Sequence, residues 1–247
     1  MRGVDAMTVS GTLALARSEL KLLWRNRLVA ATALLLPLLM AFGLSRSDDS
    51  FGDGGWGAVA GVQILAMLMF AVYSAATTAV AARRGELVLK RLRTSELPEW
   101  AVLAGMLAPL VGLAVVQALL SAALMVAFGA PAPARPALLL LAVLGGALMC
   151  CAAALVTTRI SASAEQAQVT TMPLFFVALG GAIWTISVPS DEVTPLMLAI
   201  PGSAIAELAR IAWDGSGDAL PALAMIVAWT GLAAEGAKRW FRWEPRV

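Results

Sequence analysis

One long apolar run sets the fold class of this chain. Residues 57–82 read GAVAGVQILAMLMFAVYSAATTAVAA, interrupted only by Gln63 and by residues that carry a hydroxyl group. About 20 predominantly apolar residues are enough to cross the hydrocarbon core of a bilayer as a helix. The run therefore predicts a membrane span.

Five similar runs flank this one, and the chain as a whole is apolar. Hydrophobic residues make up 60% of the 247 residues and charged residues 14%, whereas soluble domains contain about 45–50% and about 25%. Six crossings would use roughly 120 residues, which leaves little room for a soluble domain. The predicted fold class is all-α integral membrane, as a single transmembrane domain over residues 1–247. The predicted spans are 28–44, 57–82, 101–130, 137–156, 169–188 and 219–234.

A weaker apolar stretch lies between the fifth and sixth spans. Pro195 and the pair Pro201 and Gly202 interrupt it, and it is too short to cross the membrane. We expect a re-entrant outer segment over residues 189–210, built from two short helices that meet near Pro201 and Gly202.

The distribution of Lys and Arg predicts the orientation. Fifteen of the 18 precede the first span, follow the sixth, or lie between spans two and three or four and five; only Arg46, Arg135 and Arg210 lie on the other side. Cytoplasmic loops carry such an excess, so both termini are expected in the cytoplasm. No cleavable signal peptide is expected, because the first apolar run begins late and lacks a small-residue cleavage site.

Composition and motifs exclude several chemistries. Histidine is absent, which excludes imidazole metal sites and Ser-His-Asp triads. The two cysteines, Cys150 and Cys151, are adjacent in an apolar run and are expected to be packing residues. The chain contains no G-x-x-x-x-G-K-[ST] motif for binding ATP. We predict no catalytic residue, no metal site and no nucleic-acid partner.

A basic segment at residues 12–27 precedes the first span. Apolar residues up to Trp24 recur at helical spacing on one face, while Arg17, Lys21 and Arg25 share another face. Such a helix lies in the membrane interface with its cations near the lipid head groups. It could be a simple topology anchor, or an elbow helix that also contacts a cytoplasmic partner.

The loop after the second span, residues 83–100, reads RRGELVLKRLRTSELPEW. It is far longer than a connector needs to be. Residues from Glu86 to Arg93 are compatible with a helix that ends before Pro98. A solvated loop is one interpretation; a contact with another protein is the one we favour, because leucines alternate with charges along it.

Four features in this order resemble the membrane permease subunit of ATP-binding cassette exporters of the type-2 permease class, which includes antibiotic-resistance exporters of actinomycetes. The first is the elbow ending in Leu23-Trp24-Arg25-Asn26-Arg27, and the second is the loop from Arg84-Gly85 through Leu92, Thr94 and Pro98. The third is the proline-interrupted segment from Pro189 to Arg210, and the last is the basic tail Phe241-Arg242-Trp243-Glu244-Pro245.

The resemblance implies that the membrane pathway and ATP hydrolysis belong to different subunits. Such permeases pair as dimers, identical or paralogous, in the bacterial cell membrane, and two cytoplasmic ATPase subunits bind ATP and Mg. This chain would bind no cofactor itself. The loop over 83–100 resembles the coupling helix that receives the ATPase motion. The residues expected at this interface are Arg84, Gly85, Glu86, Leu89, Lys90, Arg91 and Leu92.

A substrate cavity is the remaining expectation. Large apolar residues of the second and fifth spans would suit an amphipathic, lipid-like or drug-like substrate, although the same residues could face lipid. They are Met67, Met69, Phe70, Tyr73, Phe175, Phe176 and Trp184.

Two other functional classes stay open. An integral-membrane enzyme acting on lipid is one, although no span carries paired carboxylates or a serine with a plausible base. A non-transport assembly or sensory subunit on the same scaffold is the other. The sequence leaves the substrate itself open.

Overall fold

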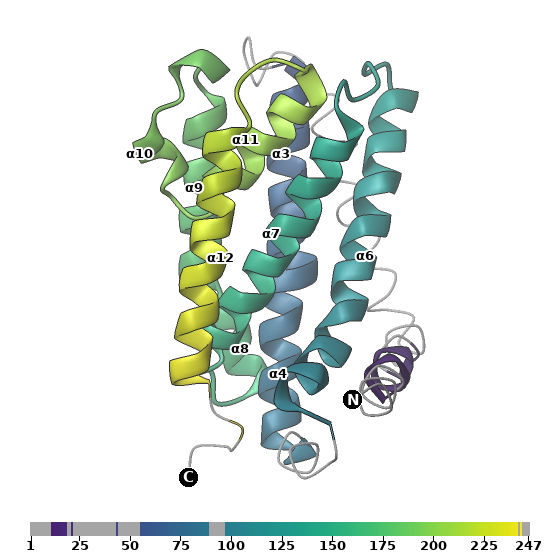
Figure 1. Ribbon diagram of the computed structural model, residues 1–247, viewed down its shortest axis with the longest axis vertical. Helices are drawn as coiled ribbons and strands as arrows, with labels where there is room; N and C mark the ends of the chain where they lie inside the picture. Colours follow the sequence, from purple (N-terminus) through teal and green to yellow (C-terminus); the bar gives the residue numbers. More distant parts are fainter. Residues whose placement is uncertain are drawn as a thin grey trace, which may run out of the picture.

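The computed structural model describes residues 11–18, 21, 43, 55–88, 97–241 and 243. All regular elements within these ranges are helices, which run mostly along one axis (Figure 1). Their bounds are α3 (Gly55–Leu68), η2 (Met69–Ser74), α4 (Ala75–Gly85), α6 (Glu99–Ala127), α7 (Pro136–Thr157), α8 (Ala164–Thr170), α9 (Met172–Ile186), η3 (Ser190–Glu192), α10 (Pro195–Leu198), α11 (Ser203–Asp214) and α12 (Leu220–Trp240).

Five helical stretches in the described part of the chain are long and apolar enough to cross a membrane. They are Gly55–Gly85, Glu99–Ala127, Pro136–Thr157, Ala164–Ile186 and Leu220–Trp240. These correspond to the second to sixth predicted spans, and the last two are longer than predicted. The first predicted span, 28–44, lies outside the described residues except for Gly43.

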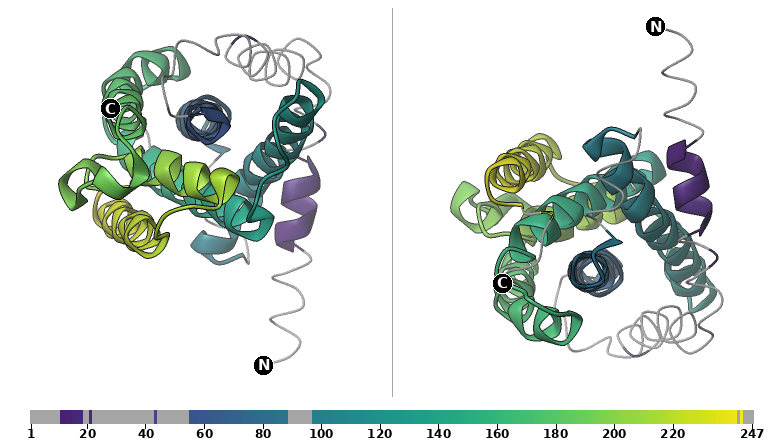
Figure 2. Two further views of the ribbon diagram at one scale, coloured as in Figure 1. Left: turned by 90° about the horizontal axis from the view of Figure 1, so that it is seen from above. Right: turned by 90° about the horizontal axis from the view of Figure 1, so that it is seen from below.

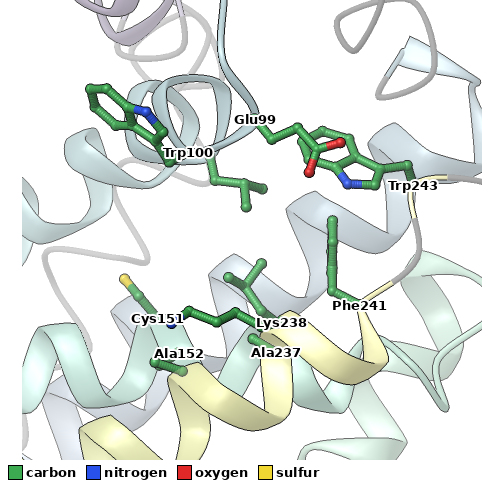
Figure 3. Close-up of a pocket in the computed structure, with 11 residues that line it drawn as sticks. Glu99, Trp100, Cys151, Ala152, Ala237, Lys238, Phe241 and Trp243 are labelled. Carbon is green, nitrogen blue, oxygen red and sulfur yellow. The ribbon is translucent and has the colours of Figure 1, made fainter.

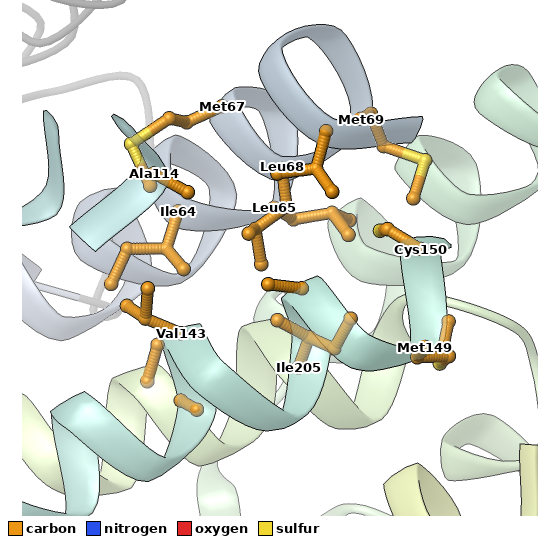
Figure 4. Close-up of a cluster of buried hydrophobic side chains, with 14 of the residues drawn as sticks. Ile64, Leu65, Met67, Leu68, Met69, Ala114, Val143, Met149, Cys150 and Ile205 are labelled. Atoms are coloured by element: carbon orange, nitrogen blue, oxygen red, sulfur yellow. The ribbon is translucent and has the colours of Figure 1, made fainter. Parts of the chain in front are cut away.

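The helix α3 runs through the middle of the bundle (Figure 2). Its side chains Leu65 and Leu68 are fully buried and point toward α7 and toward Ile205 of α11 (Figure 4). A Cβ atom on Gly146 of α7 would lie 2.6 Å from Leu68 Cδ1 and 3.1 Å from Ile205 Cδ1. The missing side chain therefore lets three helices approach closely, as small residues do in membrane bundles.

Two of the spans have a distinctive local geometry. The second span contains a π-helical segment, η2, between α3 and α4; such insertions into a helix often accompany functional sites. The third span, α6, runs through Pro109 as one helix. Neighbouring helices can satisfy the backbone groups that a proline frees in a span.

The outer segment consists of the short turn η3 and the helices α10 and α11. The two helices lie on either side of residues 199–202. In the view from above, α11 is seen from the side while α3 is seen end-on, so α11 lies across the bundle axis (Figure 2). Gly202 has a φ of 93°, and a Cβ atom there would lie 2.8 Å from the Cβ of Ala178. Both the backbone conformation and the space require glycine at this bend.

The cationic helix ends lie together. The last turns of α4, with Arg83 and Arg84, and of α12, with Lys238 and Arg239, are at the same end of the bundle, opposite α10 and α11 (Figure 1). This grouping agrees with the charge pattern that predicts the cytoplasmic side.

Candidate functional site

A buried cation holds the end of the second span. The Arg84 side chain in the last turn of α4 is only 3% exposed, and its Nη2 donates a hydrogen bond to the main-chain carbonyl of Ser161. A buried guanidinium is costly unless it is hydrogen-bonded. The bond therefore ties α4 to the loop between α7 and α8.

Hydroxyl groups continue the Arg84–Ser161 contact as a chain of hydrogen bonds toward Tyr73 of the second span. The Ser161 Oγ lies 2.5 Å from Thr170 Oγ1 of α8 and donates to the main-chain oxygen of Thr157 at 3.1 Å. The Thr157 hydroxyl in turn lies 2.9 Å from the hydroxyl of Tyr73 in η2. Together these bonds join the second, fourth and fifth spans at one level of the bundle.

The local sequence starts the fifth span beside this cluster. Ser163 precedes α8 and its Oγ accepts a hydrogen bond from the backbone N–H of Gln166 at 3.2 Å. The Gln166 side chain accepts one from the N–H of Ala162 at 2.7 Å. This reciprocal arrangement closely resembles a capping box and satisfies N–H groups that a helix start leaves free.

The chain turns sharply where it leaves α4. Gly85 ends the helix, and Leu87 has a φ of 60°, an uncommon value for a residue with a side chain. The expectation of a helix starting at Glu86 is therefore wrong for its first two residues. Gly85 and Glu86 are exposed. The other predicted interface residues, Leu89, Lys90, Arg91 and Leu92, lie outside the described residues.

The position of Arg84 also differs from expectation. It was expected at the contact with the ATPase, but its guanidinium is buried against Ser161 of the same chain. A cation can take this position because a main-chain oxygen meets it there. The sequence offers no sign of this partner, which is 77 residues away.

The predicted elbow helix is described in part. Residues 11–18 are helical, and Arg17 and Lys21 are exposed. A Cβ atom on Gly105 of α6 would lie 3.0 Å from Leu15 Cδ2, so the helix packs against the start of the third span, as Figure 1 also shows. The expected interface residues Trp24 and Arg25 lie outside the described residues.

The structure places the residues of the predicted cavity partly in the core and partly on the surface of the described bundle. Met67 and Tyr73 are fully buried in the core. The ring of Phe70 in η2 lies 4.6 Å from that of Phe175, whose ring is 5.8 Å from that of Phe176. Single-sequence patterns identify apolar residues but do not place their faces relative to neighbouring helices.

Three of the cavity residues are on the surface of the described bundle. Phe70, Phe176 and Trp184 are 44%, 64% and 47% exposed, and Met69 is buried. The aromatic group is thus an outward-facing surface of the second and fifth spans, beside the π-helical segment, with Met67, Met69 and Tyr73 in the core behind it.

A buried ion pair lies in the outer segment. Arg210 Nη2 is 2.5 Å from Glu207 Oε2 on α11, and both side chains are buried. Arg210 Nη1 also donates to the main-chain oxygen of Val188 at 2.6 Å, and Ser190 donates to Glu207. Both charges were expected within the outer segment but not as a pair; their i, i+3 spacing within an apolar stretch is the signal that could have revealed one.

The end of α11 caps the start of α3. The Asp214 carboxylate accepts a hydrogen bond from the backbone N–H of Gly57, and partial burial raises its pKa. On the other side, the main-chain N–H of Arg135 donates to the carbonyl of Ala212 at 2.8 Å. The outer segment is therefore fixed to the second span and to the loop before the fourth.

Comparison with known protein families identifies the family to which this chain belongs. The chain matches the family described as ABC-2 family transporter protein over residues 45–235. The chain belongs to this family. A search of curated proteins gave no match.

Family membership fixes the coarse function. ABC-2 membrane domains are non-catalytic, multi-pass permease subunits of ABC transporters, and they work with an ATPase partner. The matched range contains α4, the Arg84–Ser161 bond, the loop that follows and the outer segment. Within the described residues, no group of three or more potential acidic or cysteine ligands is placed to hold a metal ion.

Proposed function

We propose that this chain is the permease half of an ATP-driven exporter in a bacterial cell membrane, with both termini in the cytoplasm. Its substrate is amphipathic, either lipid-like or drug-like, in the manner of the antibiotic-resistance exporters. Two copies of a separate nucleotide-binding chain bind ATP and Mg, and a second permease, identical or paralogous, completes the pathway.

The Arg84–Ser161 hydrogen bond carries the coupling part of this proposal. The loop over 83–100 leaves the membrane from α4, whose last turn is held to the α7–α8 loop by this bond. A force applied to the loop therefore acts on the second, fourth and fifth spans at once. That is what a coupling element needs, because a rigid connection transmits motion that a flexible one would absorb.

The exposed aromatic surface supports the substrate class. Phe70 and Phe176 expose apolar rings on the second and fifth spans. A second permease placed against this surface would enclose the rings in a shared pathway. Such a lining suits apolar or amphipathic molecules better than small ions, which need charged or carbonyl ligands.

A site-directed cross-link tests the proposed partner. The single cysteine variants Glu86→Cys and Asp191→Cys, made with Cys150 and Cys151 replaced by alanine, place an exposed thiol at opposite ends of the bundle. In the native membrane, a bifunctional thiol reagent should join Glu86→Cys to an ATP-binding chain and leave Asp191→Cys without this product. Absence of the product at Glu86→Cys, or its presence at Asp191→Cys, would overturn the proposal.

A further inference from the structure

A pocket lies between three helix segments at the cationic end of the bundle. Its volume is about 350 Å³, and its walls are the start of α6 and the end of α12, with α7 between them (Figure 3). Cys151, Ala152 and Leu155 of α7 form one side. This volume is within the range of about 300–1,000 Å³ typical of small-molecule sites.

Among the described residues that line the pocket, the charged ones are Glu99 and Lys238. Figure 3 shows the Lys238 side chain extended across the pocket, opposite Glu99 and Trp243. Lys238 is 77% exposed and lies 3.9 Å from Glu235, whereas its neighbour Arg239 pairs with Glu235 at 2.8 Å. The Lys238 ammonium is thus held only weakly within the protein and can bind an anion.

One face of α7 leads from the pocket toward the middle of the span. Leu148 lies four residues before Ala152 and seven before Leu155, so the three side chains share one face of α7. Leu148 is 57% exposed, although it is in the middle of a span. An exposed leucine at this depth contacts lipid chains, so the apolar side of the pocket continues as a lipid-facing strip along α7.

The pocket's level in the membrane indicates the same kind of ligand. It lies where α6 begins and α12 ends, which is where spans meet the head-group region. Trp100 and Trp243 line it, and tryptophan is enriched at this level because its ring is apolar and its N–H is polar. A lysine stem along an apolar wall with its ammonium among head groups is the usual arrangement at such a boundary.

We infer that this pocket binds a phospholipid from the surrounding leaflet. The lipid phosphate contacts the Lys238 ammonium, and one acyl chain lies along Leu155, Ala152 and Leu148. A soluble ligand would leave the apolar strip unused, whereas a diacyl lipid matches both the cation at the rim and the apolar side below it. The site is on a different surface from the aromatic group of Phe70 and Phe176, and it does not depend on the transport function.

Lipid binding to the full chain tests this inference. The chain is purified in mild detergent, phosphatidylglycerol or diacylglycerol is added, and bound lipid is counted by native mass spectrometry. Lys238→Gln should reduce phosphatidylglycerol binding about tenfold, as loss of a charge-assisted hydrogen bond would. Arg239→Gln is the matched control, since it removes a neighbouring cation that does not line the pocket.

A second pair of variants tests the acyl-chain side. Ala152→Phe fills the pocket and should abolish the bound lipid, whereas Ala228→Phe adds the same ring at an exposed position of α12 away from it. Equal binding of diacylglycerol and phosphatidylglycerol, or equal losses in Lys238→Gln and Arg239→Gln, would overturn the inference. Because Lys238 is a surface residue, its variant gives this answer even if Ala152→Phe fails to fold.

Discussion

The guanidinium of Arg84, in the last turn of the second span, donates a hydrogen bond to the main-chain carbonyl of Ser161, in the loop before the fifth span. This contact joins the end of α4 to the α7–α8 loop at the cationic end of the bundle. It makes the proposed coupling loop an extension of three packed spans.

Removing this bond should weaken both the fold and the coupling. In Arg84→Gln the shorter side chain no longer reaches Ser161, and a buried hydrogen bond to a charged group contributes about 1.5–3 kcal/mol. We expect a lower melting temperature and a loss of substrate-stimulated ATPase activity in the assembled transporter. Arg83→Gln, a change to the more exposed neighbour, should alter both much less. Equal effects of the two substitutions would contradict the assigned role.

The buried pair in the outer segment should behave differently from a surface pair. Arg210→Met leaves the Glu207 carboxylate buried without its partner, which costs about 3–5 kcal/mol. The double variant Glu207→Gln/Arg210→Met should be more stable than Arg210→Met alone. Thermal unfolding in detergent measures both.

The exposed pair of Arg239 and Glu235 is the control for that comparison. Its two side chains are 70% and 50% exposed, and surface pairs contribute about 0–1 kcal/mol. Arg239→Met should therefore leave the melting temperature almost unchanged. If Arg210→Met were equally mild, the outer pair would not be holding α11 to the turn after α9.

Two glycines of the spans should respond oppositely to alanine. A Cβ atom on Gly61 of α3 would lie 2.5 Å from the carbonyl oxygen of Ala206 on α11, so Gly61→Ala must push these helices apart and destabilise the protein. Gly112 of α6 has open space around the same position, and Gly112→Ala should be neutral or stabilising by about 0.5–1 kcal/mol. Unfolding temperatures of the two variants decide this, and a stable Gly61→Ala would refute the close α3–α11 contact.

The spans could be predicted from the sequence because the hydrocarbon core of a bilayer requires each spanning helix to have a minimum length and an apolar composition. Both properties can be read directly from the order of residues in the chain. The second predicted span, 57–82, lies within the observed Gly55–Gly85. The bend at Pro201 and Gly202 could also be expected, since both residues disfavour a continuous helix. These features depend on local chemistry alone.

What the sequence could not provide are the relations between distant segments. Arg84 was expected at a surface, but a carbonyl 77 residues away makes its burial possible. Likewise Tyr73 was expected to line a cavity or to face lipid, whereas it is buried in the core with its hydroxyl 2.9 Å from that of Thr157. Nothing in either local sequence specifies these partners, because both depend on how the helices pack.

The orientation of the bundle remains a prediction that labelling can test. Single cysteines at Pro133 and Asp191, in a background where Cys150 and Cys151 are alanine, should react with a membrane-impermeant maleimide added to intact cells. A cysteine at Lys238 should react only after the cells are opened. Reaction at Lys238 in intact cells would invert the proposed topology.

The most direct test of the account is docking of the ATPase onto the loop over 83–100. In the proposed contact, Leu89 and Leu92 fill an apolar groove of the ATPase, and losing such anchors can cost about 2 kcal/mol or more, or roughly a thirtyfold loss of association. Two quantities are measured: binding of the ATPase to the reconstituted permease, and the ATPase activity that accompanies transport. Leu89→Ala/Leu92→Ala should impair both strongly while Arg93→Ala, a rim charge, has little effect. Normal binding and transport by the double variant would show that this loop is not the coupling element.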